Sequence, residues 1–303
     1  MKKLSKKDIE NMAVVGKGAC ATIYRIEDDK ILKLYDRGDR NTAEFVKKEF
    51  DISTVIYNMG ITTPKTYELC ECDGVYGAIY EFVSGDTMLE VIEKEGDIGN
   101  YIVELANIGK QIHAKSVDEE MFPKAVELIE RLIPNIMLWV NEEQYKHIEE
   151  LVEAIPDCST LIHGDFHPGN IILRQDKVVL IDVGGASHGH PVFDLISMHR
   201  MMMKEVQSKI NNGIYSQIYE NYIANYFDTK IFEKRKDSYN EIMEIMYYLT
   251  VIPSVCVSYG SRDDCDSIVI QYVDYMIERL LSVDVKRFEQ LFAETNDLFR
   301  VSI

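Results

Sequence analysis

The chain has 303 residues, of which 46% are hydrophobic and 28% charged, so it has a globular composition and can bury one large core or two smaller ones. Its net charge of −18 argues against a nucleic-acid partner, whose phosphates would be repelled, and is compatible with a cationic substrate or with a simple solubility role. We find no run of about eighteen apolar residues and expect no membrane span.

The N-terminus and the cysteines indicate where the protein works. The start MKKLSKKDIENM is basic, but no apolar stretch follows it, so it does not read as a signal peptide. The six cysteines are scattered and include no C-x-x-C pair. We therefore expect free thiols and a cytoplasmic location.

The first eighty residues favour a small β-rich lobe. Two runs rich in β-branched residues, 20–26 and 30–35, are separated by acidic residues and predict a hairpin. Residues 42–58 carry apolar side chains at helical spacing, and Gly60 ends that helix. A further strand is expected at 75–83.

After residue 86 the pattern becomes helical. Between the helices, 158–184 is the one β-rich island, and its second half is expected to form the second strand of a hairpin. The fold class indicated is α+β, with a small β-rich lobe followed by a large helical one. The predicted helices are 87–95, 100–115, 124–138, 142–155, 193–209, 212–227, 238–259, 266–282 and 284–299.

The glycine-rich stretch GKGACATI, residues 16–23, lies between strands and is therefore a hairpin loop. It is neither a Walker loop nor a Rossmann turn, because both of those lead into a helix. Its spacing matches the kinase glycine loop, with Ala21 in the place of the third glycine. Gly16 and Gly18 would let the backbone approach phosphates closely. Any tight hairpin can hold two glycines, so this match is weak by itself.

Lys33 lies between apolar neighbours in a strand, where a lysine is unusual unless it is paired or at an edge. One interpretation is a lysine that reaches nucleotide phosphates and is held by a glutamate of the following helix. Glu49 is the candidate partner, and Glu44 is the second choice. The other interpretation, favoured for Lys33 in isolation, is a surface lysine.

The stretch LIHGDFHPGN, residues 161–170, carries the pattern H-x-D-x-x-x-x-N, and a second aspartate follows at Asp182. This arrangement fits phosphoryl transfer: Asp165 would accept the proton of the attacking hydroxyl. Asn170 and Asp182 offer hard oxygen ligands suited to Mg²⁺ bound with nucleotide phosphates.

A zinc hydrolase is the distant alternative, because the same stretch contains His163 and His167. Glycines and a proline interrupt the segment, so the two histidines are not on a helix and their spacing does not bring them side by side. The string also differs from the patterns that require a zinc assignment.

HGDFHPGNIIL followed by LIDVGG resembles the aminoglycoside phosphotransferase and choline kinase-like family, the small-molecule branch of the protein kinase-like fold. The resemblance covers nearly the whole chain, including IGKQIH before the catalytic loop and PVFDL after it. It implies a bilobal fold, with a nucleotide-binding lobe at 1–82 and a catalytic, substrate-binding helical lobe at 83–303. Ala21 and the DVGG sequence depart from the kinase pattern, but neither removes a charge that the reaction needs.

The resemblance also implies residue roles. Asp165 would be the catalytic base, and His163 would buttress its loop without reacting. Asp194 would accept hydrogen bonds from that loop, and we expect a structural role for His113 as well. Asn170 and Asp182 would bind Mg²⁺. The nucleotide would be ATP, with GTP as the open alternative. The residues that would bind it are Gly16, Gly18, Ile23, Lys33 with its partner Glu49, and the backbone at Glu81 and Val83.

The length of one segment favours a small acceptor. Only eleven residues separate Asp182 from Asp194, and none form A-P-E, which leaves little room for a peptide-docking activation segment. We expect a hydroxyl acceptor resembling an aminoglycoside, choline, a sugar or an amino alcohol. Asp263, Asp264 and Asp266 either bind an amine-rich acceptor or belong to a solvated loop between helices, which we favour. The alternative function is a nucleotide-binding, pseudokinase-type regulatory module with little turnover.

Overall fold

The structure, a computed structural model, describes residues 1–18, 20–96, 98–174, 177–208 and 213–299. It divides by packing into two compact units. The N-terminal unit comprises Met1–Asp97 and His167–Ala186, and the C-terminal unit comprises Ile98–Phe166 and Ser187–Ile303. The sequence predicts a functional boundary after residue 82, with nucleotide binding before it and catalysis after it. This boundary stays a prediction.

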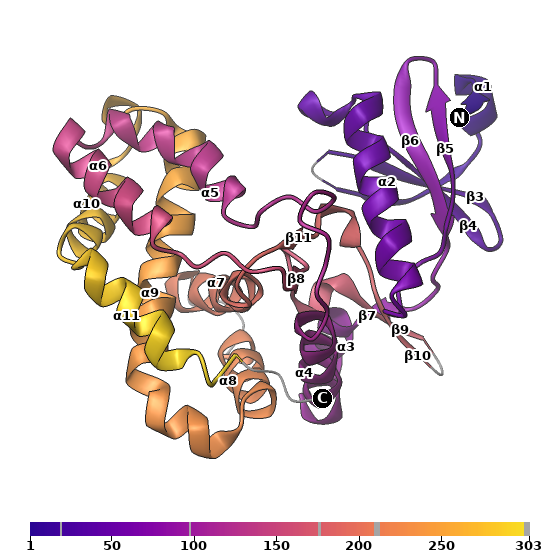
Figure 1. The fold of residues 1–303 in the computed structure, drawn as a ribbon. Helices are drawn as coiled ribbons and strands as arrows, with labels where there is room; N and C mark the ends of the chain where they lie inside the picture. The colour runs from indigo at the N-terminus through magenta and orange to yellow at the C-terminus, as the bar shows by residue number, and fades with distance from the viewer. Residues whose placement is uncertain (19, 97, 175–176, 209–212, 300–303) are drawn as a thin grey trace. The chain divides into compact units, whose positions relative to one another are not determined.

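A six-stranded sheet forms the centre of the N-terminal unit (Figure 1). Its order is β1-β5-β6-β4-β3-β2, with β1 parallel to β5 and the other neighbours antiparallel. β4 therefore lies inside the sheet, between β6 and β3. A short helix, α1, follows β1. The elements are β1 (Lys2–Leu4), α1 (Lys6–Ile9), β2 (Ala13–Lys17), β3 (Thr22–Glu27), β4 (Lys30–Leu34), β5 (Thr66–Cys72) and β6 (Val75–Glu81).

Helix α2 (Ala43–Asn58) packs against β5 and β6 (Figure 1). It begins where the Thr42 side chain accepts a hydrogen bond from the backbone of Phe45, and the left-handed Gly60 follows its end. Its buried face carries Val46, Ile52 and Ile56 at helical spacing. Glu49 lies on this same buried face, so the helix directs a carboxylate into the unit.

A second, three-stranded sheet joins β7 (Asp86–Thr87), β9 (Ile171–Arg174) and β10 (Lys177–Leu180). β9 and β10 form an antiparallel hairpin in which Ile171 pairs with Leu180. The backbone N–H of Ile181 donates to the carbonyl of Asn170 at 2.9 Å. The pairing therefore continues to the open end of the hairpin and brings Asn170 beside the segment that carries Asp182. Helix α3 (Met88–Glu95) follows β7 and packs against β9.

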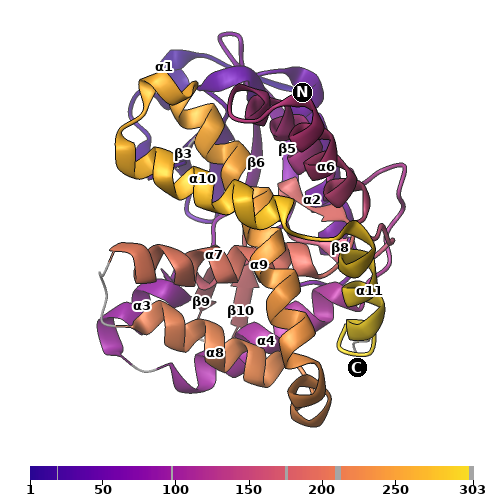
Figure 2. The ribbon, with the colours of Figure 1, turned by 90° about the vertical axis from the view of Figure 1, so that its left-hand side faces the viewer.

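The C-terminal unit is mostly helical, as expected. The long helix α9 packs against α5, α7, α10 and α11 (Figure 2), while α8 packs against both α4 and α7. β8 (Leu161–Ile162) and β11 (Ser187–His188) pair as a two-stranded sheet, and β8 leads into the loop that carries Asp165. The helices are α4 (Gly99–His113), α5 (Glu127–Leu132), α6 (Glu142–Glu153), α7 (Val192–Ser208), α8 (Ile214–Tyr226), α9 (Thr229–Tyr259), α10 (Ser267–Leu281) and α11 (Val285–Thr295).

Two helix predictions were wrong in extent. The helix expected at 238–259 begins at Thr229, because the Asp228 side chain caps it by accepting from the backbone of Lys230 and Ile231. The helix expected at 124–138 is α helix only over Glu127–Leu132. Ile133–Leu138 continues as a 3₁₀ helix with Pro134 near its start.

Within the described part of the chain, α9 alone is long and apolar enough to cross a membrane by length and composition, with a mean hydropathy of 1.4 in its best window. This differs from the sequence expectation that no such stretch exists. Because 56% of that window is buried inside the structure, α9 also fits a core helix, and its composition is weak evidence for a membrane.

Candidate functional site

The predicted site residues divide between the two units. The C-terminal unit holds His163 and Asp165, together with the two residues expected to support them, His113 and Asp194. The N-terminal unit holds Gly16, Gly18, Ile23, Lys33, Glu49, Glu81, Val83, Asn170 and Asp182.

Lys33 lies on the interior strand β4, opposite Ala78 on β6 and Ile23 on β3. Its side chain is only 20% exposed, and its Nζ lies 2.7 Å from Asp182 Oδ1 and 3.8 Å from Glu49 Oε2. Burial acts to lower the pKa of Lys33, but the charges of Asp182 and Glu49 outweigh it and raise the pKa above its usual value. Lys33 is therefore a firmly protonated, paired cation, which the surface-lysine interpretation did not anticipate.

Tyr35 is a second partner of Glu49, and sequence reasoning missed it. The buried Tyr35 hydroxyl donates to Glu49 Oε2. Burial is the main cause that raises the pKa of Tyr35, so the hydroxyl keeps its proton and remains a donor. The strand alternation that groups Tyr35 with Lys33 was a signal that could have found it. Glu44, the second choice, lies exposed in the first turn of α2.

Asp182 lies at a backbone turn directly after β10. Its φ is +59°, a left-handed conformation that aspartate tolerates better than most side chains. It begins a 3₁₀ turn, Val183–Gly185, that packs against α2. A Cβ at Gly184 would lie 3.1 Å from the Glu49 Cβ, so a small residue allows this approach. The Asp182 side chain is 55% exposed while one oxygen contacts Lys33.

His167 shapes the turn that carries Asn170. Its Nδ1 accepts a hydrogen bond from the backbone of Gly169 at 3.0 Å, and its carbonyl accepts from the backbone of Asn170 at 2.9 Å. A Cβ on Gly169 would lie 2.7 and 2.8 Å from atoms of the His167 ring, so a side chain there would force the ring or the turn to shift. These contacts of His167 thus stabilise the turn that carries Asn170.

The oxygen donors of the N-terminal unit suit magnesium. Asn170 and Asp182 offer an amide and a carboxylate oxygen near the open end of the β9–β10 hairpin, the donor types that Mg²⁺ prefers. The zinc alternative finds less support, because Nδ1 of His163 and Nδ1 of His167 each accept a backbone N–H. Among the described residues, no three His, Cys, Asp or Glu side chains form a metal-binding group.

The predicted glycine loop is shorter than expected. Gly16 lies within β2 opposite Ile23 of β3, next to a register shift; β2 ends at Lys17 and β3 begins at Thr22. The turn is closed by the Gly18 N–H, which donates to the Ala21 carbonyl at 2.9 Å. The hairpin context itself agrees with the sequence expectation.

Glu81 is the last residue of β6, and Val83 follows two positions later. The Glu81 carboxylate accepts from the Lys65 backbone at 3.2 Å and lies 3.4 Å from Arg174. Val83 is buried. Through Arg174 the end of β6 is attached to the second sheet of the N-terminal unit.

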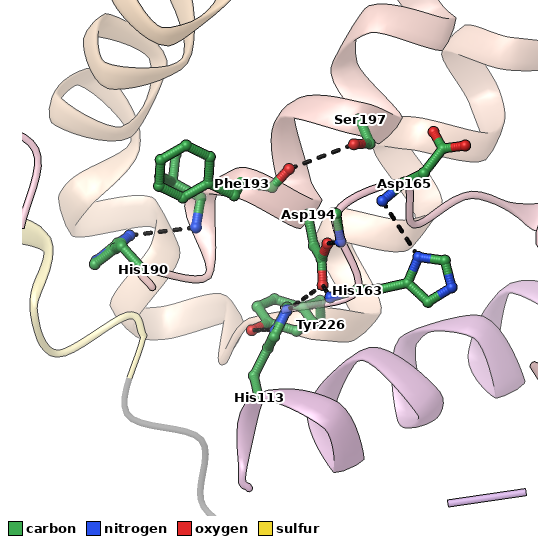
Figure 3. A network of polar contacts seen from close by, with 10 residues as sticks. His113, His163, Asp165, His190, Phe193, Asp194, Ser197 and Tyr226 are labelled. Atoms are coloured by element: carbon green, nitrogen blue, oxygen red, sulfur yellow. Dashed lines mark hydrogen bonds and ion pairs between the residues drawn. The ribbon is translucent and has the colours of Figure 1, made fainter. Parts of the chain in front are cut away.

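In the C-terminal unit a buried carboxylate holds the loop of Asp165 (Figure 3). Asp194 Oδ2 accepts from the backbone of His163 at 2.9 Å, and Oδ1 accepts from the backbone of Gly164 at 2.8 Å. Nδ1 of His163 accepts from the Asp165 backbone at 3.2 Å. The Asp165 carboxylate itself is exposed and points away from the His163 ring (Figure 3). The expected hydrogen bonds from the loop to Asp194 are thus confirmed.

His113 and Tyr226 extend this network. His113 Nε2 lies 3.0 Å from Asp194 Oδ2, and His113 Nδ1 lies 2.6 Å from the Tyr226 hydroxyl. Asp194 is fully buried, so its charge depends on these donors. Tyr226 was not foreseen, since it belongs to no motif and is 113 residues from His113 in sequence.

The fold is that of the protein kinase-like small-molecule phosphotransferases, as predicted. The chain resembles the structure of the streptomycin–ATP–APH(2")-IIa ternary complex with a TM-score of 0.57, at 16% identity over 93% of this chain and 95% of that one. A choline/ethanolamine kinase family protein from Mesorhizobium loti gives a TM-score of 0.56, at 13% identity over 92% and 91%. At such identities these likenesses establish the fold alone.

The sequence places the chain in a family. The model of the Phosphotransferase enzyme family matches residues 12–230, and the chain belongs to this family. No curated protein matches the chain in sequence. The family membership that HGDFHPGN and LIDVGG indicated is therefore confirmed.

Proposed function

We propose that the protein is an ATP- and Mg²⁺-dependent phosphotransferase that moves the γ-phosphate to a hydroxyl of a small molecule. The observation that carries this proposal is the cluster of Lys33, Glu49 and Asp182, in which a largely buried cation lies 2.7 Å from a half-exposed carboxylate. A phosphotransferase needs such a cation for the nucleotide phosphates beside an oxygen ligand for the metal. Family membership supports the same reaction class.

The nucleotide is assigned to the N-terminal unit. Lys33 would contact the α- and β-phosphates while Glu49 and Tyr35 hold it in place, and the backbone at Gly16 and Gly18 would approach the phosphates. The adenine would lie under Ile23, with its edge at the backbone of Glu81 and Val83. The similar APH(2")-IIa structure contains ATP and the APH(2'')-Ib structure contains ADP, whereas that of aminoglycoside 2'-phosphotransferase-IIIa contains GDP. ATP is our assignment, and GTP is the natural competitor to test.

Asp165 is assigned as the base that accepts the proton of the acceptor hydroxyl. Its exposed carboxylate projects from a loop whose backbone is held by Asp194, so it is both accessible and fixed. Five residues of extended chain span no more than about 18 Å, and this covalent connection sets the upper limit of the separation between Asp165 and Asn170. Mg²⁺ held by Asn170 and Asp182 would neutralise negative charge on the phosphates. His163 orients the loop through the Asp165 backbone.

The acceptor is a small hydroxyl compound. The eleven residues between Asp182 and Asp194 form a 3₁₀ turn, the short strand β11 and the start of α7, without a long activation segment. The similar structures include complexes with streptomycin and gentamicin and a choline/ethanolamine kinase family protein. The acceptors to test are therefore aminoglycosides, choline, ethanolamine, sugars and other amino alcohols.

The test measures nucleotide consumption by the purified protein with Mg²⁺ and each acceptor, for the wild type and Asp165→Asn. We expect turnover with at least one acceptor and a loss of about 10²–10⁴-fold in Asp165→Asn, the usual contribution of a general base. Nucleotide binding without any Asp165-dependent turnover would instead favour the regulatory-module alternative. Omission of Mg²⁺ and replacement of ATP by GTP test the cofactor assignment in the same assay.

A further inference from the structure

Tyr226 ends α8, and His113 ends α4, so the packing of these two helices brings the side chains together (Figure 3). The Tyr226 hydroxyl lies 2.6 Å from His113 Nδ1, and the two rings meet edge to face with centroids 5.6 Å apart. Both side chains are buried. This contact lies on the far side of His113 from Asp194, which holds the loop of Asp165.

The hydrogen-bond acceptors among Asp194, His113 and Tyr226 indicate which atoms carry the protons. An ionised carboxylate only accepts hydrogen bonds, and the Asp194 oxygens already accept from the backbones of His163 and Gly164. His113 Nε2 faces Asp194 Oδ2 as the donor of this pair, and in a singly protonated imidazole Nδ1 is then the acceptor. Burial, and secondarily the charge of Asp194, raise the pKa of Tyr226, so its hydroxyl keeps its proton and donates to Nδ1.

We propose that Tyr226 is a positioning residue for the phosphotransfer reaction assigned above: its hydroxyl holds His113 in the Nε2–H tautomer, so that His113 and Asp194 fix the backbone of the Asp165 loop. This inference rests on the proposed function for its effect on turnover, while the tautomer and the loop are physical properties that are measured without turnover. Tyr226 touches no substrate in this scheme. It acts through His113 and Asp194.

A neighbouring tyrosine provides a matched control. Tyr222 lies one helical turn earlier on α8 and stacks against Tyr226 with ring centroids 5.4 Å apart. Its hydroxyl is buried, and it has no hydrogen-bond partner among the described residues. Tyr222→Phe and Tyr226→Phe therefore delete the same atom from the same helix, but only the second deletes a hydrogen bond in the network.

The experiment compares the wild type, Tyr226→Phe and Tyr222→Phe by three measurements. The first is the tautomer of His113, observed by ¹⁵N NMR of histidine-labelled protein and assigned with a His113→Gln variant. The second is hydrogen exchange of the backbone amides at 163–165. The third is kcat and the nucleotide KM with the best acceptor.

We expect Tyr226→Phe to populate the Nδ1–H tautomer of His113, to speed exchange at 163–165, and to lower kcat by about tenfold with little change in nucleotide KM. The nucleotide KM should stay nearly unchanged, because we assign the nucleotide to residues of the N-terminal unit. Tyr222→Phe should match the wild type in all three measurements. In the His113→Gln background, Tyr226→Phe should have no further effect, because the glutamine amide donates to Asp194 without help from the tyrosine.

A wild-type tautomer and wild-type exchange at 163–165 in Tyr226→Phe would overturn the inference, and so would equal effects of the two tyrosine substitutions. Exchange rates in the distant helix α6 report whether a variant has lost structure generally. If the wild type shows no Asp165-dependent turnover, the proposed function fails. The tautomer and exchange measurements still decide whether Tyr226 positions the loop.

Discussion

Lys33 Nζ lies 2.7 Å from Asp182 Oδ1, although the two residues are 149 positions apart in the sequence. Lys33 comes from an interior strand of the large sheet, and Asp182 from the turn after β10. The lysine side chain is only 20% exposed, whereas the carboxylate that it contacts is 55% exposed. In the function that we propose, these two groups serve the nucleotide phosphates and the metal.

Replacement of the lysine should damage nucleotide use more than folding. Lys33→Met keeps the length of the side chain and removes the cation, so we expect kcat/KM for the nucleotide to fall by at least about 100-fold. Steady-state kinetics with Mg²⁺ measure this. Lys30→Met on the same strand removes an ion pair with Glu27 and a cation–π contact with Tyr67, neither of which involves Glu49 or Asp182, and should leave the kinetics unchanged. Equal losses in both variants would contradict the role of Lys33.

Removal of the Tyr35 hydroxyl should destabilise the N-terminal unit. Tyr35→Phe leaves the buried Glu49 carboxylate without one of its donors, which should lower the free energy of unfolding by about 1.5–3 kcal/mol. Urea denaturation measures the change. Tyr57→Phe, at an exposed position of α2, is the control and should change stability by less than about 0.5 kcal/mol. A neutral Tyr35→Phe would mean that Glu49 does not depend on this hydrogen bond.

The turn before Asn170 should reject a side chain at Gly169. Gly169→Ala places a Cβ within 2.8 Å of the His167 ring, so either the ring or the turn must shift, at a cost of about 1–3 kcal/mol. Gly185→Ala is the matched control, because a Cβ there would meet nothing within 4 Å. Thermal and urea unfolding of the two variants should therefore differ clearly, and equal stabilities would disprove the steric account.

His190 should make the protein less stable in mild acid. Burial, and secondarily the nearby His113, lower the pKa of His190 to about 3, while the unfolded value is close to 6.5. The unfolded state therefore binds more protons between these values, and stability present above pH 6.5 is lost as the pH falls. Between pH 7 and pH 5 the loss from this residue should be on the order of 2 kcal/mol.

The check is urea denaturation at several pH values for the wild type and His190→Asn. Asparagine can still accept the backbone N–H of Val192, which His190 accepts through Nδ1 at 3.2 Å, but it does not titrate. The variant starts from a lower stability, because it loses the ring contacts with Phe292 and Phe299. Its loss of stability on acidification should nevertheless be smaller than in the wild type. An unchanged pH dependence would exclude His190 as the cause.

Local patterns in the sequence were enough for much of the fold. The β3–β4 hairpin, α2 and the β9–β10 hairpin lie close to their predicted ranges, because side-chain periodicity and turn residues act over a few positions. The spacing of His163, Asp165 and Asn170 likewise indicated the reaction class. Errors arose where a local signal was misjudged, as at the start of α9, where Asp228 caps a charged segment.

The sequence by itself therefore determined the fold class and the family, and it predicted the residues that would carry the chemistry, since motifs and periodicity are written in neighbouring positions. Only the tertiary structure decided which side chains support them. Tyr35 reaches Glu49, Asp182 reaches Lys33, and Tyr226 reaches His113, because separate strands and helices pack together. A buried hydrogen bond between distant segments leaves no periodic trace in the chain, since its partners are chosen by packing geometry and by the need to satisfy buried polar groups.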